Sequence, residues 1–257
     1  MLNRISYISK HIYLLSIYYI RAWFITAFTK DPIKKRHKQA QNIHRNAKKF
    51  RKAFKMTLTV NNLERLKAFD GKPLLLVGNH VSYTDIVVLS ALDELIFITS
   101  VEMGNDPFLG SITRLGGCLY TDRINPQSLK DEIHRFGDVI MQGFKVVLFP
   151  EGTSTNGDTV LDFRRSLFEI ASSSGAPILP VCVRYKRLDG KEIDESNRDS
   201  LYWYGDMTFL PHFLGLIGKS IEVEVTFLEP IFDTADKKRS DLSDMTHQQI
   251  KECFHQA

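Results

Sequence analysis

A histidine and an aspartate five residues apart are the first candidates for catalytic chemistry. His80 follows the apolar run 73–77, and Asp85 ends the segment G-N-H-V-S-Y-T-D at 78–85. Imidazole is the usual general base near neutral pH, and a carboxylate bonded to its far nitrogen fixes the tautomer and stabilises the imidazolium. The pair predicts a base and its orienting acid. On this spacing alone, an aspartate that caps a helix beside a structural histidine is the alternative.

Two other kinds of catalytic site find less support in the sequence. His80, Asp85 and Glu151 are metal ligands by residue type, but no second histidine or cysteine cluster accompanies them, so we expect no metal. The sequence also has no G-x-S-x-G motif, which argues against a serine hydrolase of the α/β-hydrolase kind.

The candidate pair must be positioned by a sheet. From about residue 70, short apolar runs alternate with helical periods, which predicts an α/β fold with a single, largely parallel sheet flanked by helices. Helices are predicted at 128–140, with a capping-box-like start at Ser128, and at 163–173. The predicted strands are 74–77, 95–99, 118–121, 146–149, 178–183 and 221–227. Functional residues of such sheets gather where strands end and helices begin, as His80 and Asp85 do.

Three further predicted strands are bordered by unusual residues. G-G-C-L-Y-T-D-R at 116–123 ends in Arg123, F-P-E-G-T-S at 149–154 places Glu151 in a turn, and A-P-I-L-P-V at 176–181 sets two prolines around a buried strand. Together with 78–85, these blocks resemble, in the same order, those of the glycerolipid acyltransferase family, which includes bacterial 1-acylglycerol-3-phosphate acyltransferases. The resemblance covers about residues 70–190, and the blocks at 78–85 and 149–153 are its most specific part.

The resemblance implies transfer of a fatty acyl group from a thioester, on coenzyme A or acyl carrier protein, to the hydroxyl of a lysophospholipid. It implies 1-acylglycerol-3-phosphate as acceptor, with an ornithine-type or remodelled lysolipid as the alternative, and no cofactor beyond the thioester co-substrate. His80 would take the hydroxyl proton, Asp85 would orient it, and Arg123 would hold the acceptor's phosphate. The implied substrate-binding residues are Asn79, Arg123, Glu151, Gly152, Thr153 and Pro180.

Several of these assignments have a structural alternative. Arg123 could pair with a neighbouring acid, Glu151 could be a turn residue, and Pro180 could shape the backbone only. The adjacent Arg164 and Arg165 could add phosphate contacts or remain solvated.

Two departures from the common family pattern concern the phosphate site. Many members carry a lysine ahead of the glutamate in the segment that reads T-S-V-E at 99–102 here, and Ser154 replaces the arginine that often follows F-P-E-G-T. Both changes remove positive charge. They put in doubt whether plain lysophosphatidic acid is the acceptor, but they leave His80 and Asp85 intact.

The basic residues are concentrated at the N-terminal end. Residues 1–55 have 14 Lys and Arg against one acid, a net charge of +13, whereas 56–257 have a net charge of −9. The aromatic, apolar stretch 12–28 is marginal as a transmembrane span because Arg21 splits it, and it has a poor cleavage site for a signal peptide. We interpret it as a helix in the membrane interface, with its four Tyr and Trp side chains among the headgroups and the cations of 34–38 on anionic lipid.

The expected organisation is therefore a membrane-interface helical segment at 1–55 and an acyltransferase domain at 56–257. We expect a peripheral or monotopic protein on the cytoplasmic face of the inner membrane, without a nucleic-acid partner. The alternatives from other classes are a solvated basic helix, a non-catalytic module that binds membranes or nucleic acid, and a lipid hydrolase. Three scattered cysteines without a C-x-x-C pair suit a reducing compartment: Cys118, Cys182 and Cys253.

Overall fold

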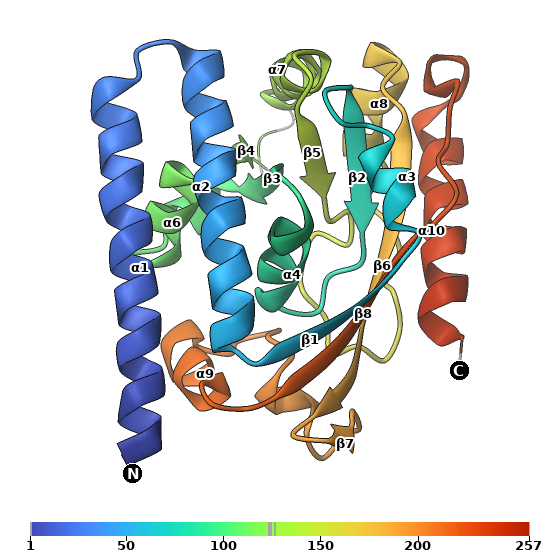
Figure 1. Ribbon diagram of the computed structural model, residues 1–257. Coiled ribbons are helices and arrows are strands. Elements are labelled where there is room, and N and C mark those ends of the chain that lie inside the picture. Colours follow the sequence, from blue (N-terminus) through green and yellow to red (C-terminus); the bar gives the residue numbers. More distant parts are fainter. Residues whose placement is uncertain (1, 123–124, 126, 257) are drawn as a thin grey trace.

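The computed structural model describes residues 2–122, 125 and 127–256. Two long helices, α1 (Leu2–Phe28) and α2 (Pro32–Ala53), run in opposite directions along one side of an α/β domain (Figure 1). The described residues of this domain form an eight-stranded sheet in the order β1-β8-β6-β2-β5-β3-β4, with β7 paired to β6.

All six predicted strands are present. The strands are β1 (Met56–Asn61), β2 (Leu74–Gly78), β3 (Leu95–Ser100), β4 (Leu119–Thr121), β5 (Lys145–Leu148), β6 (Ile178–Leu188), β7 (Lys191–Glu192) and β8 (Ile221–Phe227). The predicted single, mostly parallel sheet is confirmed, because β2 pairs in parallel with both β5 and β6, and β3 with β4 and β5. The long β6 is the exception, since it pairs antiparallel with β8 and β7. The sequence did not predict β1 or β7.

Helices cover both faces of the sheet (Figure 1). Leu74 and Leu76 of β2 pack into a core that includes α4 residues, whereas Leu75 and Val77 pack into a second core with Phe136 of α7. Successive strand side chains point to opposite faces, so a strand buried on both sides is a continuous apolar run. The helices of the domain are α3 (Leu63–Lys67), α4 (Thr84–Leu92), α5 (Val101–Asn105), α6 (Leu109–Leu115), α7 (Leu129–Met141), α8 (Glu169–Ser174), α9 (Phe209–Leu216) and α10 (Arg239–His255).

Two details of the helix prediction are wrong. The Ser128 side chain does not cap α7, because its hydroxyl donates to the carbonyl of Asn125 at 2.9 Å. The helix predicted from Phe163 begins later, with a 3₁₀ turn at Arg165–Phe168 that leads into α8. Arg164 is extended there because its backbone N–H donates to the carbonyl of Pro150 at 2.9 Å, which joins this segment to the turn that follows β5.

Helix α1 is buried on one side only. Tyr18 is buried and donates to the Ile112 carbonyl at 2.7 Å, and the Tyr19 hydroxyl lies 2.6 Å from that of Ser111. Two of the four aromatic side chains expected among lipid headgroups therefore contact α6 instead. Large apolar side chains remain exposed on α1 at Ile5, Ile12, Tyr13, Ile20, Trp23, Phe24 and Phe28. Within the described residues, no helix combines the length and apolar content that crossing a membrane requires.

A buried lysine connects the start of β5 to the segments around it. Lys145 is 5% exposed, and its Nζ donates to Asp93 at 2.7 Å and to Asp70. Burial raises the pKa of Asp93, but hydrogen bonds from Lys145 and Lys67 outweigh burial, and the net pKa lies below its ordinary value. The ion pair therefore contributes to stability wherever Asp93 is ionised.

We expect Lys145→Met to lower the free energy of unfolding at pH 7 by about 2 kcal/mol, because Asp93 loses its buried ion-pair partner and keeps Lys67 and the N–H of Glu94. Since the pKa of Asp93 is lowered in the folded state, this contribution is complete above the ordinary value of 3.8 and is lost as the pH falls through the folded value. Denaturant unfolding at pH 7 and pH 3 measures the difference from the wild type. The exposed Lys130→Met is the control, and an equal loss at both pH values would contradict the ion-pair account.

Candidate active site

His80 and Asp85 meet at the carboxyl end of β2. His80 Nδ1 lies 2.8 Å from Asp85 Oδ2, with the Asp85 side chain fully buried and that of His80 17% exposed. The same Oδ2 accepts the N–H groups of Val81 and Ser82 at 2.8 and 3.0 Å. Asp85 therefore both anchors the loop before α4 and orients the histidine. With Nδ1–H donated to a carboxylate, the neutral ring keeps a proton-accepting lone pair on Nε2.

The second oxygen of Asp85 is held from β6. The Tyr185 hydroxyl donates to Asp85 Oδ1 at 2.7 Å and lies 2.6 Å from Thr84 Oγ1. Burial, and then the charge of Asp85, raise the pKa of Tyr185 well above its ordinary value, so the phenol stays protonated and keeps donating. This role of Tyr185 was not predicted from the sequence, because Tyr185 lies 100 residues from Asp85, in a strand whose apolar pattern indicates only a core position.

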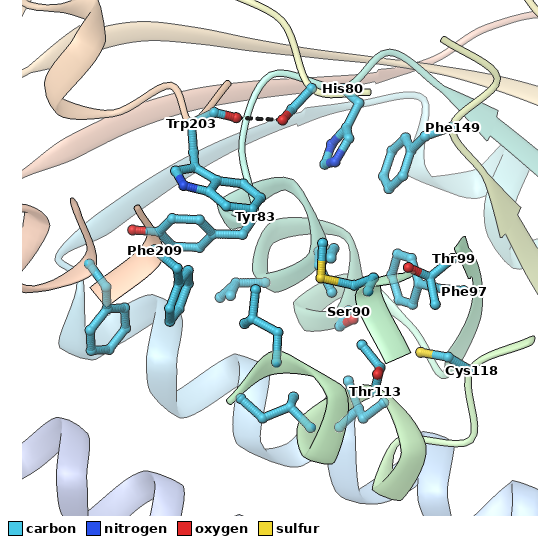
Figure 2. A pocket seen from close by; sticks show the side chains of 18 of the residues that line it. His80, Tyr83, Ser90, Phe97, Thr99, Thr113, Cys118, Phe149, Trp203 and Phe209 are labelled. Carbon is cyan, nitrogen blue, oxygen red and sulfur yellow. Dashed lines mark hydrogen bonds between the residues drawn. The ribbon is translucent and has the colours of Figure 1, made fainter. Parts of the chain in front are cut away.

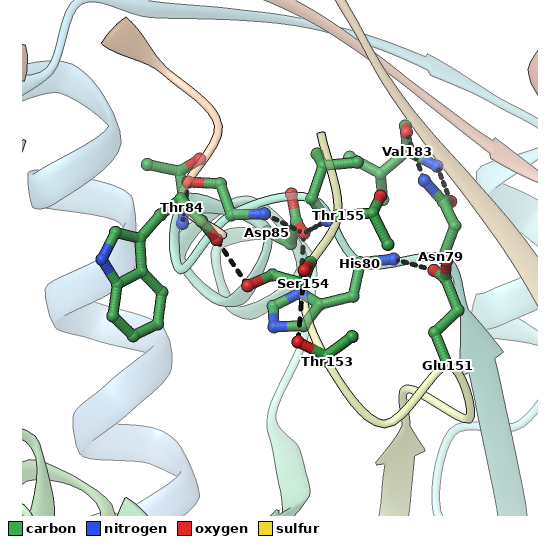
Figure 3. Close-up of polar contacts among 12 residues, drawn as sticks. Asn79, His80, Thr84, Asp85, Glu151, Thr153, Ser154, Thr155 and Val183 are labelled. Atoms are coloured by element: carbon green, nitrogen blue, oxygen red, sulfur yellow. Dashed lines mark hydrogen bonds and ion pairs between the residues drawn. The ribbon is translucent and has the colours of Figure 1, made fainter. Parts of the chain in front are cut away.

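The turn after β5 closes around His80 (Figure 3). The His80 N–H donates to Glu151 Oε1 at 2.7 Å, and the His80 carbonyl accepts the N–H of Thr155 at 3.0 Å. Glu151 Oε2 accepts the N–H of Leu161 at 2.9 Å. Burial raises the pKa of Glu151 to about 7, although these backbone hydrogen bonds lower it. Glu151 thus links the histidine loop to the segment that returns at Leu161.

Three residues predicted to bind substrate lie behind the site. The Asn79 amide is 1% exposed and bonds both backbone groups of Val183, at 2.9 and 2.8 Å, which joins β2 to β6. Pro180 is buried in β6 opposite Val77. Both carboxylate oxygens of Glu151 accept backbone N–H groups. Asn79, Glu151 and Pro180 therefore hold the backbone around the site, and none of them lines the cavity.

Two of the predicted substrate-binding residues do reach the cavity. Gly152 and Thr153 line it together with His80. Gly152 has φ +74°, and a β-carbon there would lie 2.7 Å from Nε of Arg164, so only glycine fits this turn. Arg123 lies outside the described residues, and its role in phosphate binding stays a prediction.

The cavity has a volume of about 410 Å³ and is mostly apolar. Figure 2 shows the imidazole of His80 projecting into it, and Phe149 stacks on the ring with centroids 4.3 Å apart. The rest of the wall comes from α1, α2, α4, β3, α5, α6, α9 and loops between elements, and the lining residues within the described part of the chain include no Asp, Glu, Lys or Arg. Such a wall suits a hydrocarbon chain.

Aromatic side chains from the 203–213 segment close one part of this cavity. Trp203 and Phe209 line it beside Tyr83, with ring centroids of Tyr83 6.0 Å from Trp203 and 4.9 Å from Phe209. The backbone N–H of Trp203 donates to the carbonyl of Val81 at 3.0 Å, which brings this segment to the loop that carries His80. Their part in the cavity wall was not predicted from the sequence. The aromatic cluster Y-W-Y-G at 202–205 is the sequence feature that could have indicated it.

Comparison with known proteins decides the family. A model of the acyltransferase family matches residues 57–184. The lyso-ornithine lipid O-acyltransferase of Brucella abortus is 32% identical over 199 residues, which cover 74% of each chain. The chain belongs to the acyltransferase family. The family and the acyltransferase activity implied by the four sequence blocks are confirmed.

Further relatives of this acyltransferase carry two substrate names. The lyso-ornithine lipid O-acyltransferase of Rhizobium meliloti is 31% identical over 70% of this chain and 64% of its own. The 1-acyl-sn-glycerol-3-phosphate acyltransferase of Neisseria gonorrhoeae is 30% identical over 46% of each chain. The crystal structure of PlsC, the 1-acyl-sn-glycerophosphate acyltransferase of Thermotoga maritima, matches 96% of this chain and 95% of its own with a TM-score of 0.62. At 18% identity, this likeness shows a shared fold.

We expect Glu151→Gln to lower kcat at least tenfold and to change KM for the acyl donor less than twofold. One backbone N–H would face the amide NH₂ of glutamine, and an unsatisfied buried donor loosens the loop that holds His80. Steady-state kinetics measure both constants, with the exposed Glu192→Gln as control. An unchanged kcat with a higher KM for the lipid acceptor would contradict this account and indicate that Glu151 contacts the acceptor.

Proposed function

We propose that this acyltransferase moves a fatty acyl group from a thioester to the hydroxyl of a lysolipid, with His80 as the general base. One observation carries the proposal. His80, oriented by the buried Asp85, projects into an apolar cavity whose described lining residues carry no charge. A base at the wall of a hydrocarbon-sized cavity suits chemistry at the junction of an acyl chain and a polar group.

The reaction needs one proton acceptor and one aligned hydroxyl. His80 Nε2 takes the proton of the acceptor hydroxyl as its oxygen forms a bond to the thioester carbonyl carbon. The carbon–sulfur bond then breaks, and the thiol leaves with the proton from His80. Asp85 stabilises the imidazolium in between. The thioester is already activated, so the proposal includes no covalent enzyme intermediate and no cofactor beyond coenzyme A or acyl carrier protein as acyl carrier.

For the acceptor, we propose an ornithine-type lysolipid. The relatives named for lyso-ornithine lipid match over 74% and 70% of this chain, whereas the Neisseria relative named for 1-acylglycerol-3-phosphate matches over 46%. The serine at position 154 and the T-S-V-E segment at 99–102, which lack the cations of the common pattern, agree with this preference. The Neisseria relative supports 1-acylglycerol-3-phosphate as the second candidate.

We further propose that α1 lies on the membrane as a peripheral or monotopic anchor, on the cytoplasmic face of the inner membrane. Trp23, Phe24 and Phe28 form an exposed aromatic cluster near the end of α1, with Trp23 and Phe24 centroids 4.9 Å apart. The exposed Lys30 and Lys34 follow directly. Aromatic rings at the headgroup level beside cations suit an anionic lipid surface.

We expect His80→Ala to lower kcat for acyl transfer by about 10² to 10⁴, the range that a general base contributes. The assay incubates full-length protein with both thioester donors and a panel of lysolipids, and identifies products by mass. Asp85→Asn is expected to lose most activity as well, because the tautomer and the charge stabilisation are lost. Undiminished transfer by a folded His80→Ala protein would refute the mechanism, and free fatty acid released without acceptor would indicate a hydrolase.

We expect substitution of Trp23, Phe24 and Phe28 by serine to reduce flotation of the full chain with anionic liposomes. Lys30→Gln with Lys34→Gln should weaken binding in proportion to anionic lipid content, since each cation contributes about 1 kcal/mol near an anionic surface. Substitution is preferable to truncation, because α2 forms part of the cavity wall. Flotation that is unaffected by both sets, or independent of anionic lipid, would show that this cluster is not the anchor.

A further inference from the structure

One arginine lies against the turn that holds His80. Glu151 and Thr155 both bond the backbone of His80, and Gly152 and Thr153 between them line the same cavity as His80. The guanidinium of Arg164 lies against Gly152, where a β-carbon would be 2.7 Å from its Nε and 2.9 Å from its Cζ. A cation therefore lies next to the residues that border the catalytic histidine.

The chain holds Arg164 in this position through its backbone. The Arg164 N–H donates to the carbonyl of Pro150 at 2.9 Å, and the N–H of Leu161 donates to Glu151 at 2.9 Å. The segment 152–164 thus leaves the turn and returns to it. Because the backbone is fixed at both ends, the side chain of Arg164 is delivered to Gly152 without depending on an ion pair of its own.

The neighbouring Arg165 has a different environment. Its Nη2 lies 3.1 Å from Asp244 Oδ1 on α10, so its charge is paired away from the cavity. The exposed guanidinium of Arg164, by contrast, has no hydrogen-bond or ion-pair partner among the residues that the structure describes. Of the two arginines that the sequence left equivalent, Arg164 is the one whose donors remain available to a ligand.

The proposed acceptors carry a group that such a cation can bind. The described cavity lining carries no charged side chain, whereas the proposed acceptors carry a carboxylate or a phosphate on the headgroup. An arginine presents paired N–H donors that match either oxyanion, and charge-assisted contacts of this kind also fix orientation. A headgroup held at Gly152 would keep the neighbouring hydroxyl close to His80, with the hydrocarbon part toward the apolar wall.

We propose that Arg164 binds the oxyanion of the lysolipid headgroup and thereby selects acceptors that carry a carboxylate or a phosphate. This inference rests on the proposed acyl transfer to a lysolipid. The candidate acceptors share one chemical feature. Each has a carboxylate or a phosphate that a short glycerol or amino-acid unit separates from the reacting hydroxyl.

The experiment compares three acceptors in detergent micelles with full-length protein and one acyl thioester. Lyso-ornithine lipid supplies a carboxylate, 1-acylglycerol-3-phosphate a phosphate, and monoacylglycerol no charge. For Arg164→Ala we expect kcat/KM to fall about 10- to 100-fold with the carboxylate- or phosphate-bearing acceptor that the enzyme uses, since a hydrogen bond to a charged group is lost. KM for the thioester and turnover of monoacylglycerol should change less than twofold. Arg164→Lys should retain part of the activity, because it keeps the charge and loses the planar fork.

Arg165→Ala is the matched control and should leave the ratio of kcat/KM for the oxyanion-bearing acceptor to that for monoacylglycerol within twofold of the wild type. A selective loss in Arg164→Ala with only one of the two oxyanion-bearing lipids identifies which oxyanion Arg164 binds. An equal loss with charged and neutral acceptors, a rise in KM for the thioester alone, or no change would overturn the inference. Failure of the proposed function has a different signature, since wild-type protein would then acylate none of the three acceptors.

Discussion

The active site depends on one buried carboxylate. Asp85 is fully buried, and a carboxylate removed from water must receive hydrogen bonds on both oxygens. Its donors come from the His80 ring, the backbone of the loop after β2, and Tyr185 on β6. Satisfying this single group therefore fixes the histidine rotamer, the start of α4 and the position of β6 together. The imidazole is positioned by the same contacts that close the core around it.

A second set of contacts holds the histidine from the end of β5. Glu151 and Thr155 hold the backbone of His80 from the side of the turn after β5, while Phe149 stacks on its ring. Since β2 and β5 are parallel neighbours, their carboxyl ends deliver the histidine and this turn to the same edge of the sheet. The same turn brings Gly152 and Thr153 to the cavity that His80 lines.

The N-terminal helices belong to this arrangement as well as to the surface. Helix α2 contributes Asn46, Ala47 and Phe50 to the cavity wall, and His44 Nδ1 lies 2.7 Å from the carbonyl of Ser90 on α4. Helix α1 packs beside it and keeps its aromatic cluster outward. The segment with a charge of +13 thus forms part of the cavity wall, so a membrane bound at α1 would lie close to the site that is proposed to take lipid substrates.

The sequence by itself determined what local spacing can carry. Apolar runs predicted the six strands, and the five-residue separation predicted that His80 and Asp85 can meet. Tertiary structure alone decided the partners that come from distant elements: Tyr185 on Asp85, Asn79 on Val183, and Arg164 on Gly152. It also decided that Glu151 supports His80 and that Tyr18 and Tyr19 face inward. The physical reason is that hydrogen bonds across a sheet join residues more than 100 positions apart, as Asn79 and Val183 are, and no periodicity along the chain records which of them will be neighbours.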